Sequence, residues 1–448
     1  MGAPPLIPVT PGPGAPDEDH AGKDHAGKAV LGLGDPGRSI EPNPGLWAPV
    51  IVEADRFSPG TVVTMSDGKW RRGESRERLV RAALQSVCAV GPSAVSGRAV
   101  AREAGVYNAQ VQQMFGSVAE LVNEAVMAER NRYVERVFPP TGLPDPLAVA
   151  EHPDLWRSIT QVILDPGPVD MRALASGGPL ALLGQRLGAE DPERSPSLNA
   201  TIAAAWVAAP LGALIFQDPL RRGLALGGTD WDHCFNQLGV LLQALAEQRS
   251  LPSVRAPDRR RGSGEGHGDV QGGRARLVVA AEDLLGSRLE AAVTGRELAL
   301  HAGVNYGLVT HYFGSKSAVF DAALENLHRR FLRDVLAENA ERPDEVDVHE
   351  VFIAHRAFIR AWAARLLGDR PVPEFELLGM ADLVARLGRL DARRKGDGQD
   401  PVVRALAVIS LQLGWTILEP LPASARPREA SPLGTELRQV HRWMLTSR

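Results

Sequence analysis

The chain has 448 residues, of which 44% are apolar, and a formal net charge of −4. This length predicts two or three domains with a substantial core, and the near-neutral average excludes a protein that is basic throughout. The cysteines, Cys88 and Cys234, are too few for a disulfide framework or a metal cluster and indicate a reducing compartment, so we expect a cytoplasmic protein.

Residues 1–68 are unlike the rest of the chain because they hold eleven prolines and eleven glycines. Such a segment cannot bury enough apolar surface to offset its chain entropy, which predicts a disordered tail. The stretch "GKDHAGKA" at 22–29 nearly matches a phosphate-binding loop, but Ala29 replaces the magnesium-binding hydroxyl and no strand precedes it. A nucleotide site is therefore not expected. The N-terminus also lacks the layout of a secretion signal.

The region directly after the tail is basic. Beyond the tail the apolar residues recur at the spacing of α-helices. Residues 69–118 hold eight bases against three acids, whereas residues 1–68 hold four bases against nine acids. A basic segment within a neutral protein indicates contact with nucleic acid. The apolar run "ATIAAAWVAAPLGALIF" at 200–216 is short for a membrane span and interrupted by Pro210, so we expect a buried helix and no membrane.

Two stretches of the chain repeat each other at an offset of 198 residues. Between 76–117 and 274–315 there are 42 ungapped positions, of which 18 are identical. A period this long indicates two copies of a whole domain and not a solenoid. The Gly- and Pro-rich stretch 252–273 lies between the copies and predicts a linker.

The second copy predicts two short helices joined by a tight turn. Thr294 and Glu297 have the spacing of a capping box. The first short helix is expected to end at Gly303, where the turn needs a positive φ. A second short helix is expected over about 305–312, and Ser315 is expected to cap a long helix. This order describes a helix-turn-helix unit.

The second short helix of such a unit enters the major groove of DNA. Its outward residues carry donors, acceptors and planar rings that suit base edges and phosphates. The helix can approach DNA closely at Gly307, and Lys316 is long enough to reach a phosphate. The outward residues are Asn305, Tyr306, Gly307, Thr310, His311 and Tyr312.

The segment "VTGRELALHAGVNYGLVTHYFGSKSAVFDAAL" (293–324) resembles the N-terminal DNA-binding domain of the TetR family of bacterial transcriptional regulators. The capped helix, "A-G-V" and the "Y-F-G-S-K" junction fall at family spacing. The resemblance implies an all-α fold whose C-terminal domain holds a ligand pocket and dimerises through its last two helices. It also implies phosphate or base contacts by Thr294, Thr310, His311, Tyr312 and Lys316, and the full candidate set of this unit adds Arg296, Asn305, Tyr306 and Gly307.

The chain is thus expected to contain two tandem TetR-like units. The expected segments are a disordered tail (1–68), a divergent first helix-turn-helix domain (69–137), a first helical regulatory domain (138–251), the linker (252–273), a second helix-turn-helix domain (274–325) and a second helical regulatory domain (326–448).

The first copy departs from the pattern of the second. Ser96 keeps the cap but Ala99 replaces its glutamate partner, while Met114 and Val118 stand where the second copy has Tyr312 and Lys316. Its weaker candidate contacts include Asn and Gln, which can bind adenine with two hydrogen bonds. They are Ser96, Arg98, Tyr107, Asn108, Gln110, Gln112 and Gln113. The preceding helix gains arginines at positions 71, 72, 76, 78 and 81.

These features predict a DNA-binding transcriptional regulator and not an enzyme. The sequence has no metal-ligand spacing, no HExxH, no nucleophile elbow and no paired CxxC, so neither catalysis nor a metal or cofactor is expected. We expect a nucleoid-associated bacterial repressor that binds double-stranded DNA. A small apolar or amphipathic effector is expected to release the protein from the DNA. Pairing of the last two helices of each half, about 199–249 and 401–446, predicts a pseudo-symmetric monomer on two unlike half-sites, with a homodimer as the alternative.

Three other interpretations of the sequence stay open. In the first, only the second unit binds DNA and the first is a scaffold or a protein-interaction module. In the second, both units are degenerate and bind proteins, which would remove salt-dependent DNA affinity. In the third, an enzyme site lies within the helical halves, which would give an activity independent of residues 303–316.

Overall fold

The computed structural model describes residues 72–253, 272–286, 288–341, 348–368, 375, 377, 380–394, 400–419 and 432–446. The predicted tail (1–68) and residues 254–271 of the predicted linker lie outside the described residues. Within the described ranges all regular structure is helical and no strand occurs. The predicted all-α fold class is therefore confirmed.

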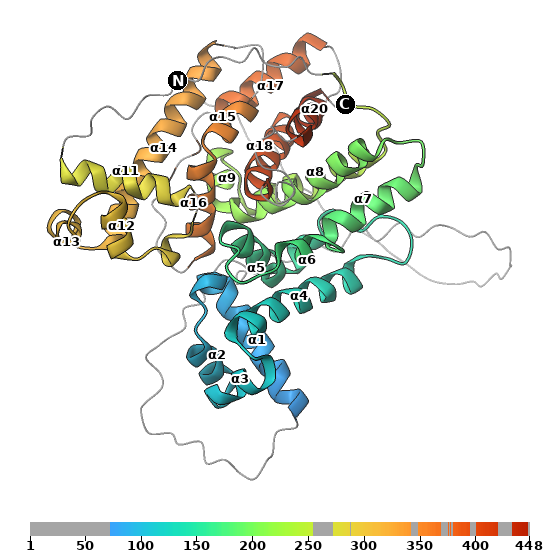
Figure 1. Cartoon of the computed structure of the whole chain (residues 1–448). Coiled ribbons are helices and arrows are strands. Elements are labelled where there is room, and N and C mark those ends of the chain that lie inside the picture. The colour runs from blue at the N-terminus through green and yellow to red at the C-terminus, as the bar shows by residue number, and fades with distance from the viewer. Residues whose placement is uncertain are drawn as a thin grey trace, which may run out of the picture. The chain divides into compact units, whose positions relative to one another are not determined.

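The helices of the first half fall into a helix-turn-helix group and the helices of the expected regulatory domain, here called the regulatory group (Figure 1). The helix-turn-helix group consists of α1 (Arg72–Val90), the 3-10 turn η1 (Pro92–Ala94), α2 (Gly97–Ala104), α3 (Asn108–Phe115) and α4 (Val118–Val137). The regulatory group consists of η2 (Ala148–Glu151), α5 (Pro153–Leu164), α6 (Met171–Ala175), α7 (Pro179–Glu190), α8 (Pro196–Ile215), α9 (Gln217–Gly223) and α10 (Gly228–Ala246).

The helix-turn-helix elements of the second half repeat the order of those in the first. Its helix-turn-helix group consists of α11 (Gly273–Leu285), η3 (Glu290–Ala292), α12 (Gly295–His301), α13 (Gly307–Phe313) and α14 (Lys316–Glu341). Its regulatory group consists of α15 (His349–Ala354), α16 (Arg356–Leu367), α17 (Met380–Arg394), α18 (Pro401–Leu418) and α20 (Pro432–Thr446).

The two most apolar helices, α8 and α18, are core helices that pack along each other (Figure 1). Their length and composition alone would let them cross a membrane, but 83% and 89% of their apolar windows are buried within the protein. Trp206 on α8 and Trp415 on α18 are 4% and 2% exposed. The run at 200–216 is thus part of a buried helix, as its pattern predicts, and Pro210 lies inside that helix.

The backbones of α8 and α18 contact each other at two glycines, one on each helix, that each face the backbone of the other helix. A Cβ on Gly212 would lie 2.0 Å from the carbonyl oxygen of Ser410, and a Cβ on Gly414 would lie 1.8 Å from that of Ala208. No side chain fits at such distances, so only glycine permits this approach. Helices α10 and α20 flank the crossing, since α20 contacts α8 and α10 contacts α18.

The apolar core runs through both regulatory groups and into the second helix-turn-helix group, whereas the first helix-turn-helix group has a core cluster of its own. Cys88 belongs to the core cluster of the first helix-turn-helix group, and burial raises the pKa of its thiol to about 12. A thiol that stays protonated at neutral pH is a poor nucleophile. Cys88 and the buried Cys234 therefore serve packing.

Candidate nucleic-acid interface

Local hydrogen bonds build the second helix-turn-helix group as its sequence predicts. The hydroxyl of Thr294 accepts from the Glu297 N–H (3.2 Å), and the Glu297 carboxylate accepts from the Thr294 N–H (3.4 Å). Gly303 has φ +61° in the turn after α12. The hydroxyl of Ser315 accepts from the Ala318 N–H (3.1 Å) at the start of α14. Val309 is 2% exposed, which fixes the inward face of α13.

The recognition helix α13 begins at Gly307, two residues later than the sequence predicts. The side-chain oxygen of Asn305 accepts from the Gly307 N–H (2.8 Å), so Asn305 and Tyr306 belong to the turn that precedes the helix. Part of the hydrogen-bonding capacity of Asn305 is therefore used to start the helix.

The candidate contact residues of the second unit lie at the protein surface with one exception. Tyr306 and Tyr312 keep 50% and 41% of their surface exposed, which is high for tyrosine. The rings of His311 and Tyr312 meet edge to face at 5.0 Å. Lys316 is half-buried. The exposed candidates are Thr294, Arg296, Asn305, Tyr306, Gly307, Thr310, His311 and Tyr312.

The side chain of Lys316 makes hydrogen bonds inside its own domain. Its Nζ donates to the carbonyl oxygens of Glu290 (3.0 Å) and Val293 (2.6 Å). The ammonium thereby ties the first turn of α14 to the segment around η3. The phosphate contact expected for Lys316 stays a prediction, and in the structure this lysine holds the two segments that flank α12 and α13.

The first unit presents a different surface on the same helices. Tyr107, with 73% of its surface exposed, precedes α3, and Asn108, Gln112 and Gln113 are exposed on it. Gln110 is half-buried, and its side-chain oxygen accepts from the Tyr107 N–H (3.2 Å). This bond leaves mainly the amide nitrogen of Gln110 for a base edge.

The expectation that Ser96 caps α2 is wrong in its detail. Ser96 occupies the N-cap position and is exposed, as is Arg98, but the Ser96 hydroxyl makes no capping hydrogen bond to α2. In the second unit Glu297 closes the reciprocal pair with Thr294. Ala99 has no group that could do so, and the first unit therefore enters α2 without the box.

Two of the five arginines counted as gains of the first unit are shared by both units. The Arg76 guanidinium lies 4.4 Å from the centre of the Phe115 ring, donates to the Met114 carbonyl oxygen (3.0 Å) and pairs with Glu124. At the equivalent positions Arg274 lies 4.9 Å from the centre of the Phe313 ring. This cation–π pair joins the first helix of each unit to its second short helix, α3 or α13.

A second arginine pair is repeated in the same way. Arg276 donates to the Gly303 carbonyl oxygen (3.3 Å), and its counterpart Arg78 lies against Gly105, the counterpart of Gly303. Sequence reasoning missed both pairs, although the identities at an offset of 198 could have indicated them. Arg81 is exposed, Arg71 lies outside the described residues, and the side chain of Arg72 is not among those described.

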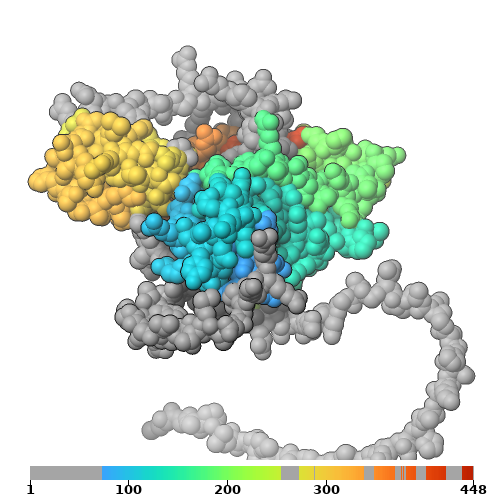
Figure 2. Space-filling model, turned by 60° about the horizontal axis from the view of Figure 1, so that its bottom comes forward, coloured from blue at the N-terminus to red at the C-terminus, as the bar shows by residue number. Residues whose placement is uncertain are grey.

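Both helix-turn-helix groups reach the surface on one face of the protein. Figure 2 shows the first in blue and the second in yellow, and the turns η1 and η3 contact each other. The exposed faces of α3 and α13 are polar, and polar side chains of this kind suit contact with a DNA groove.

Comparison with known proteins identifies a family for the second helix-turn-helix group. The model of a family described as bacterial regulatory proteins, tetR family, matches residues 277–323. The HTH-type transcriptional repressor Rv3405c of Mycobacterium tuberculosis (strain H37Rv) is 31% identical over 156 residues, which are 34% of this chain and 76% of that protein. The HTH-type transcriptional regulator Mb3439c of Mycobacterium bovis matches with the same identity and the same shares.

Proposed function

The chain belongs to the tetR family of bacterial regulatory proteins and is a DNA-binding transcriptional regulator, and on this premise we propose that it is a ligand-responsive repressor built from two tandem units. The two units pair within one chain and bind two unlike half-sites of double-stranded DNA. The six segments expected from the sequence, from the tail to the second regulatory domain, are the parts of this proposal. Its setting is the bacterial cytoplasm, in association with the nucleoid.

The observation that carries the proposal is a set of reciprocal contacts between the halves. Gly212 on α8 faces the Ser410 carbonyl on α18, and Gly414 on α18 faces the Ala208 carbonyl on α8. Reciprocity of this kind characterises the interface of a two-fold symmetric dimer. Here both partners belong to one chain.

A second reciprocal pair joins α5 to α16. Arg157 on α5 donates to the carbonyl oxygen of Leu367 at the end of α16 (3.4 Å), and Arg360 on α16 donates to that of Ile163 near the end of α5 (2.9 Å). Glu436 on α20 adds a further link, because it accepts from the Thr201 hydroxyl on α8 (2.7 Å). These contacts support a pseudo-symmetric monomer.

The unlike half-sites follow from the side chains at matched positions of the recognition helices. Thr310 and His311 in the second unit correspond to Gln112 and Gln113 in the first, and all four are exposed. Glutamine binds adenine with two hydrogen bonds, whereas threonine and histidine offer other donors, acceptors and a methyl group. The two helices therefore favour different bases.

Matched double substitutions test whether each recognition helix reads its own half-site. Thr310→Ala with His311→Ala is expected to weaken binding to a selected operator about 10- to 100-fold, and Gln112→Ala with Gln113→Ala about tenfold, with each pair relaxing preference in its own half-site. The measurement is DNA binding to operator variants, at stated salt, after selection from random duplexes.

Two outcomes of that measurement decide between the interpretations. If the Gln112/Gln113 pair changes neither affinity nor preference, the first unit is a scaffold or a protein-interaction module and only the second binds DNA. If neither pair changes binding, the assignment of α3 and α13 as recognition helices is wrong.

The proposed effector site is an apolar cavity of about 620 Å³ in the first regulatory group. It lies among α4, α5, α6, α7 and α8, and its walls include Trp156, Ile159, Leu180 and Val207. The few polar side chains there include Arg130, which donates to the Ala173 carbonyl oxygen on α6. A mostly apolar cavity of this size suits a small apolar or amphipathic molecule. Because α4 continues from the recognition helix, an occupant beside α4 has a direct route to α3.

A graded pair of substitutions at Gly184 tests the effector site. Gly184 lines the cavity, and a Cβ there would meet nothing within 4 Å, so Gly184→Leu fills space while Gly184→Ala barely does. With the neutral dye N-phenyl-1-naphthylamine as probe, Gly184→Leu is expected to lower affinity about tenfold, because the leucine side chain occupies space in which the dye would bury apolar surface. Gly184→Ala should bind the dye as the parent does. Equal binding by all three proteins would place the dye elsewhere.

A further inference from the structure

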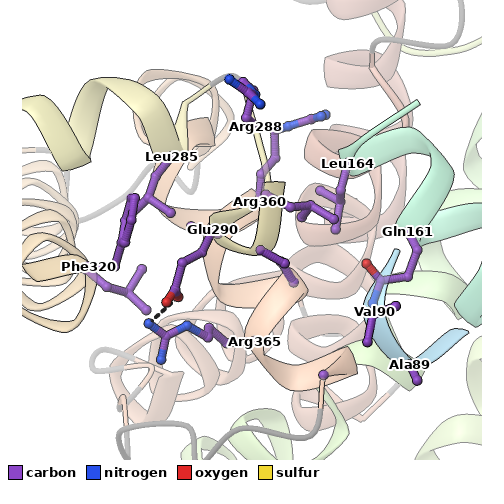
Figure 3. A pocket seen from close by; sticks show the side chains of 16 residues that line it. Ala89, Val90, Gln161, Leu164, Leu285, Arg288, Glu290, Phe320, Arg360 and Arg365 are labelled. Carbon is purple, nitrogen blue, oxygen red and sulfur yellow. Dashed lines mark ion pairs between the residues drawn. The ribbon is translucent and has the colours of Figure 1, made fainter. Parts of the chain in front are cut away.

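A second cavity lies at the junction of the two halves and has a different character. Its volume is about 270 Å³, and Figure 3 shows the side chains that line it. The end of α1 and α5 contribute Ala89, Val90, Gln161 and Leu164. The opposite wall comes from α11, η3, α14 and α16 of the second half. Its apolar side chains include Leu285, Leu289, Phe320 and Leu324.

The polar lining of this junction cavity is dominated by arginine. Arg288, Arg360 and Arg365 line it against one carboxylate, Glu290. Arg365 is already neutralised, because it pairs with Glu290 (2.6 Å) and with Asp321 (2.7 Å). Arg288 pairs with Glu297, which lies on α12 and not in the lining.

Arg360 differs from its two neighbours. It donates to the carbonyl oxygens of Ile163 (2.9 Å) and Ile417 (3.3 Å), and no carboxylate of a described residue forms an ion pair with it. Guanidinium has five N–H donors, so these two bonds leave capacity for a further acceptor. Burial, together with the nearby Arg356, lowers the pKa of Arg360, and Glu419 only partly opposes this shift. Arg360 is half-buried, and a partly desolvated cation without an ion-pair partner gains from an anion that reaches it.

From this geometry we propose that the junction cavity binds a small organic carboxylate, whose anionic head meets Arg360 and whose apolar body contacts Leu289 and Phe320. Arginine suits this head because its planar donors match the two oxygens of a carboxylate. The volume lies just below that of ordinary ligand pockets, which selects a small molecule such as an aromatic or short-chain acid. The site is separate from the apolar cavity beside α4.

The position of the carboxylate site gives its occupant control over the spacing of the DNA-binding groups. The turn η1 contacts η3 beside the cavity, and a Cβ on Gly91 would lie 2.9 Å from Cδ1 of Leu289. The two halves thus meet there with little free space. A ligand bound between α1 and η3 makes different contacts when the two helix-turn-helix groups are closer together and when they are further apart. Such a difference in contacts is required for a ligand to shift the populations of the two arrangements.

The test is calorimetric titration of the full chain, without DNA, using sodium benzoate and the neutral benzamide as probes. Benzoate is expected to bind once per chain and at least about tenfold more tightly than benzamide, because only benzoate makes charge-assisted bonds to Arg360. Arg360→Gln is expected to weaken benzoate binding about 10- to 100-fold and to leave benzamide unchanged. The control is Arg389→Gln, an exposed position on α17 outside the cavity, which should bind benzoate as the parent does.

Arg360 also joins α16 to α5 and α18, so Arg360→Gln could lose benzoate binding because it destabilises the fold. Two cavity-filling variants that keep Arg360 control for this. Ala89→Leu fills the cavity from the first half and Ala364→Leu from the second. Both are expected to keep the parent's helical circular dichroism and to abolish benzoate binding. Equal affinity for benzoate and benzamide, no saturable benzoate binding, or retained binding in both filled variants would each overturn the proposal. DNA affinity measured without benzoate stays an independent readout of the proposed repressor function.

Discussion

Gly414→Leu is expected to separate α8 from α18 and to lower the free energy of unfolding by about 3 kcal/mol or more, at the upper end of overpacking effects. Even a Cβ at this position would lie 1.8 Å from the carbonyl oxygen of Ala208. The neighbour is backbone in the middle of a helix and cannot rotate away as a side chain would. The helices must therefore move apart, which exposes the apolar crossing around Trp206 and Trp415.

The measurement is chemical denaturation followed by circular dichroism, with a matched helical glycine as control. A Cβ on Gly388 in α17 would lie 3.9 Å from the nearest atom, on Pro401, which is ordinary contact. Gly388→Ala should therefore be neutral or stabilise by about 0.5–1 kcal/mol, because alanine favours the helix. Unchanged stability of Gly414→Leu would show that α8 and α18 do not cross here in solution.

The reciprocal glycine supplies a further check on the same crossing. A Cβ on Gly212 would lie 2.0 Å from the Ser410 carbonyl oxygen, so Gly212→Leu should destabilise the protein as Gly414→Leu does. Once either substitution has opened the crossing, the second has less to disturb. The two effects are therefore expected to be less than additive, with a coupling of about 1–3 kcal/mol in a double-mutant cycle.

Most features fixed by neighbours in sequence could be predicted, with the Ser96 cap and the start of α13 as exceptions, whereas features fixed by distant backbone could not. The box of Thr294 and Glu297, the turn at Gly303 and the cap at Ser315 depend on residues within three or four positions, and each is found where expected. The length of Lys316 suggested a phosphate contact, but its acceptors are carbonyls more than twenty residues away. No local pattern encodes that approach.

The crossing of α8 and α18 shows the same limit at larger scale. Apolar composition predicts that both helices are buried and favours their pairing. The composition does not say which residues meet, because a nearly all-apolar helix presents no distinct face. Gly212 and Gly414 mark the contact only once the two backbones are seen together. The junction cavity is likewise invisible in the sequence, since Gln161 and Arg360 are far apart along the chain and belong to different halves.

The proposed tandem arrangement leads to the second large expected effect, which concerns the symmetry of the operator. The full chain is expected to scatter light as a monomer of 48.1 kDa and to select a DNA site with two unlike halves. Internal pairing is favoured because the linked unit has a high effective concentration. A symmetric homodimer of identical reading surfaces would instead select a palindrome.

Making α3 resemble α13 is expected to change the preferred DNA site from two unlike halves to a palindrome. The exchange replaces five exposed positions and the half-buried Met114 and Val118 of the first unit by their counterparts. Val118→Lys is included because the carbonyl oxygens of Pro92 and Val95 stand where Lys316 finds Glu290 and Val293 in the second unit. The substitutions are Tyr107→Asn, Asn108→Tyr, Ala109→Gly, Gln112→Thr, Gln113→His, Met114→Tyr and Val118→Lys.

The exchanged protein should select a palindrome of the half-site that α13 reads, and its affinity for that palindrome should rise about 100-fold over the parent's. The gain follows from base contacts of about 1–3 kcal/mol each that the first unit now makes. A parent protein that scatters as twice 48.1 kDa and already selects a palindrome would contradict the intrachain pairing and leave the first unit as a scaffold. An exchanged protein that still selects the parent's site would show that α3 does not enter the groove.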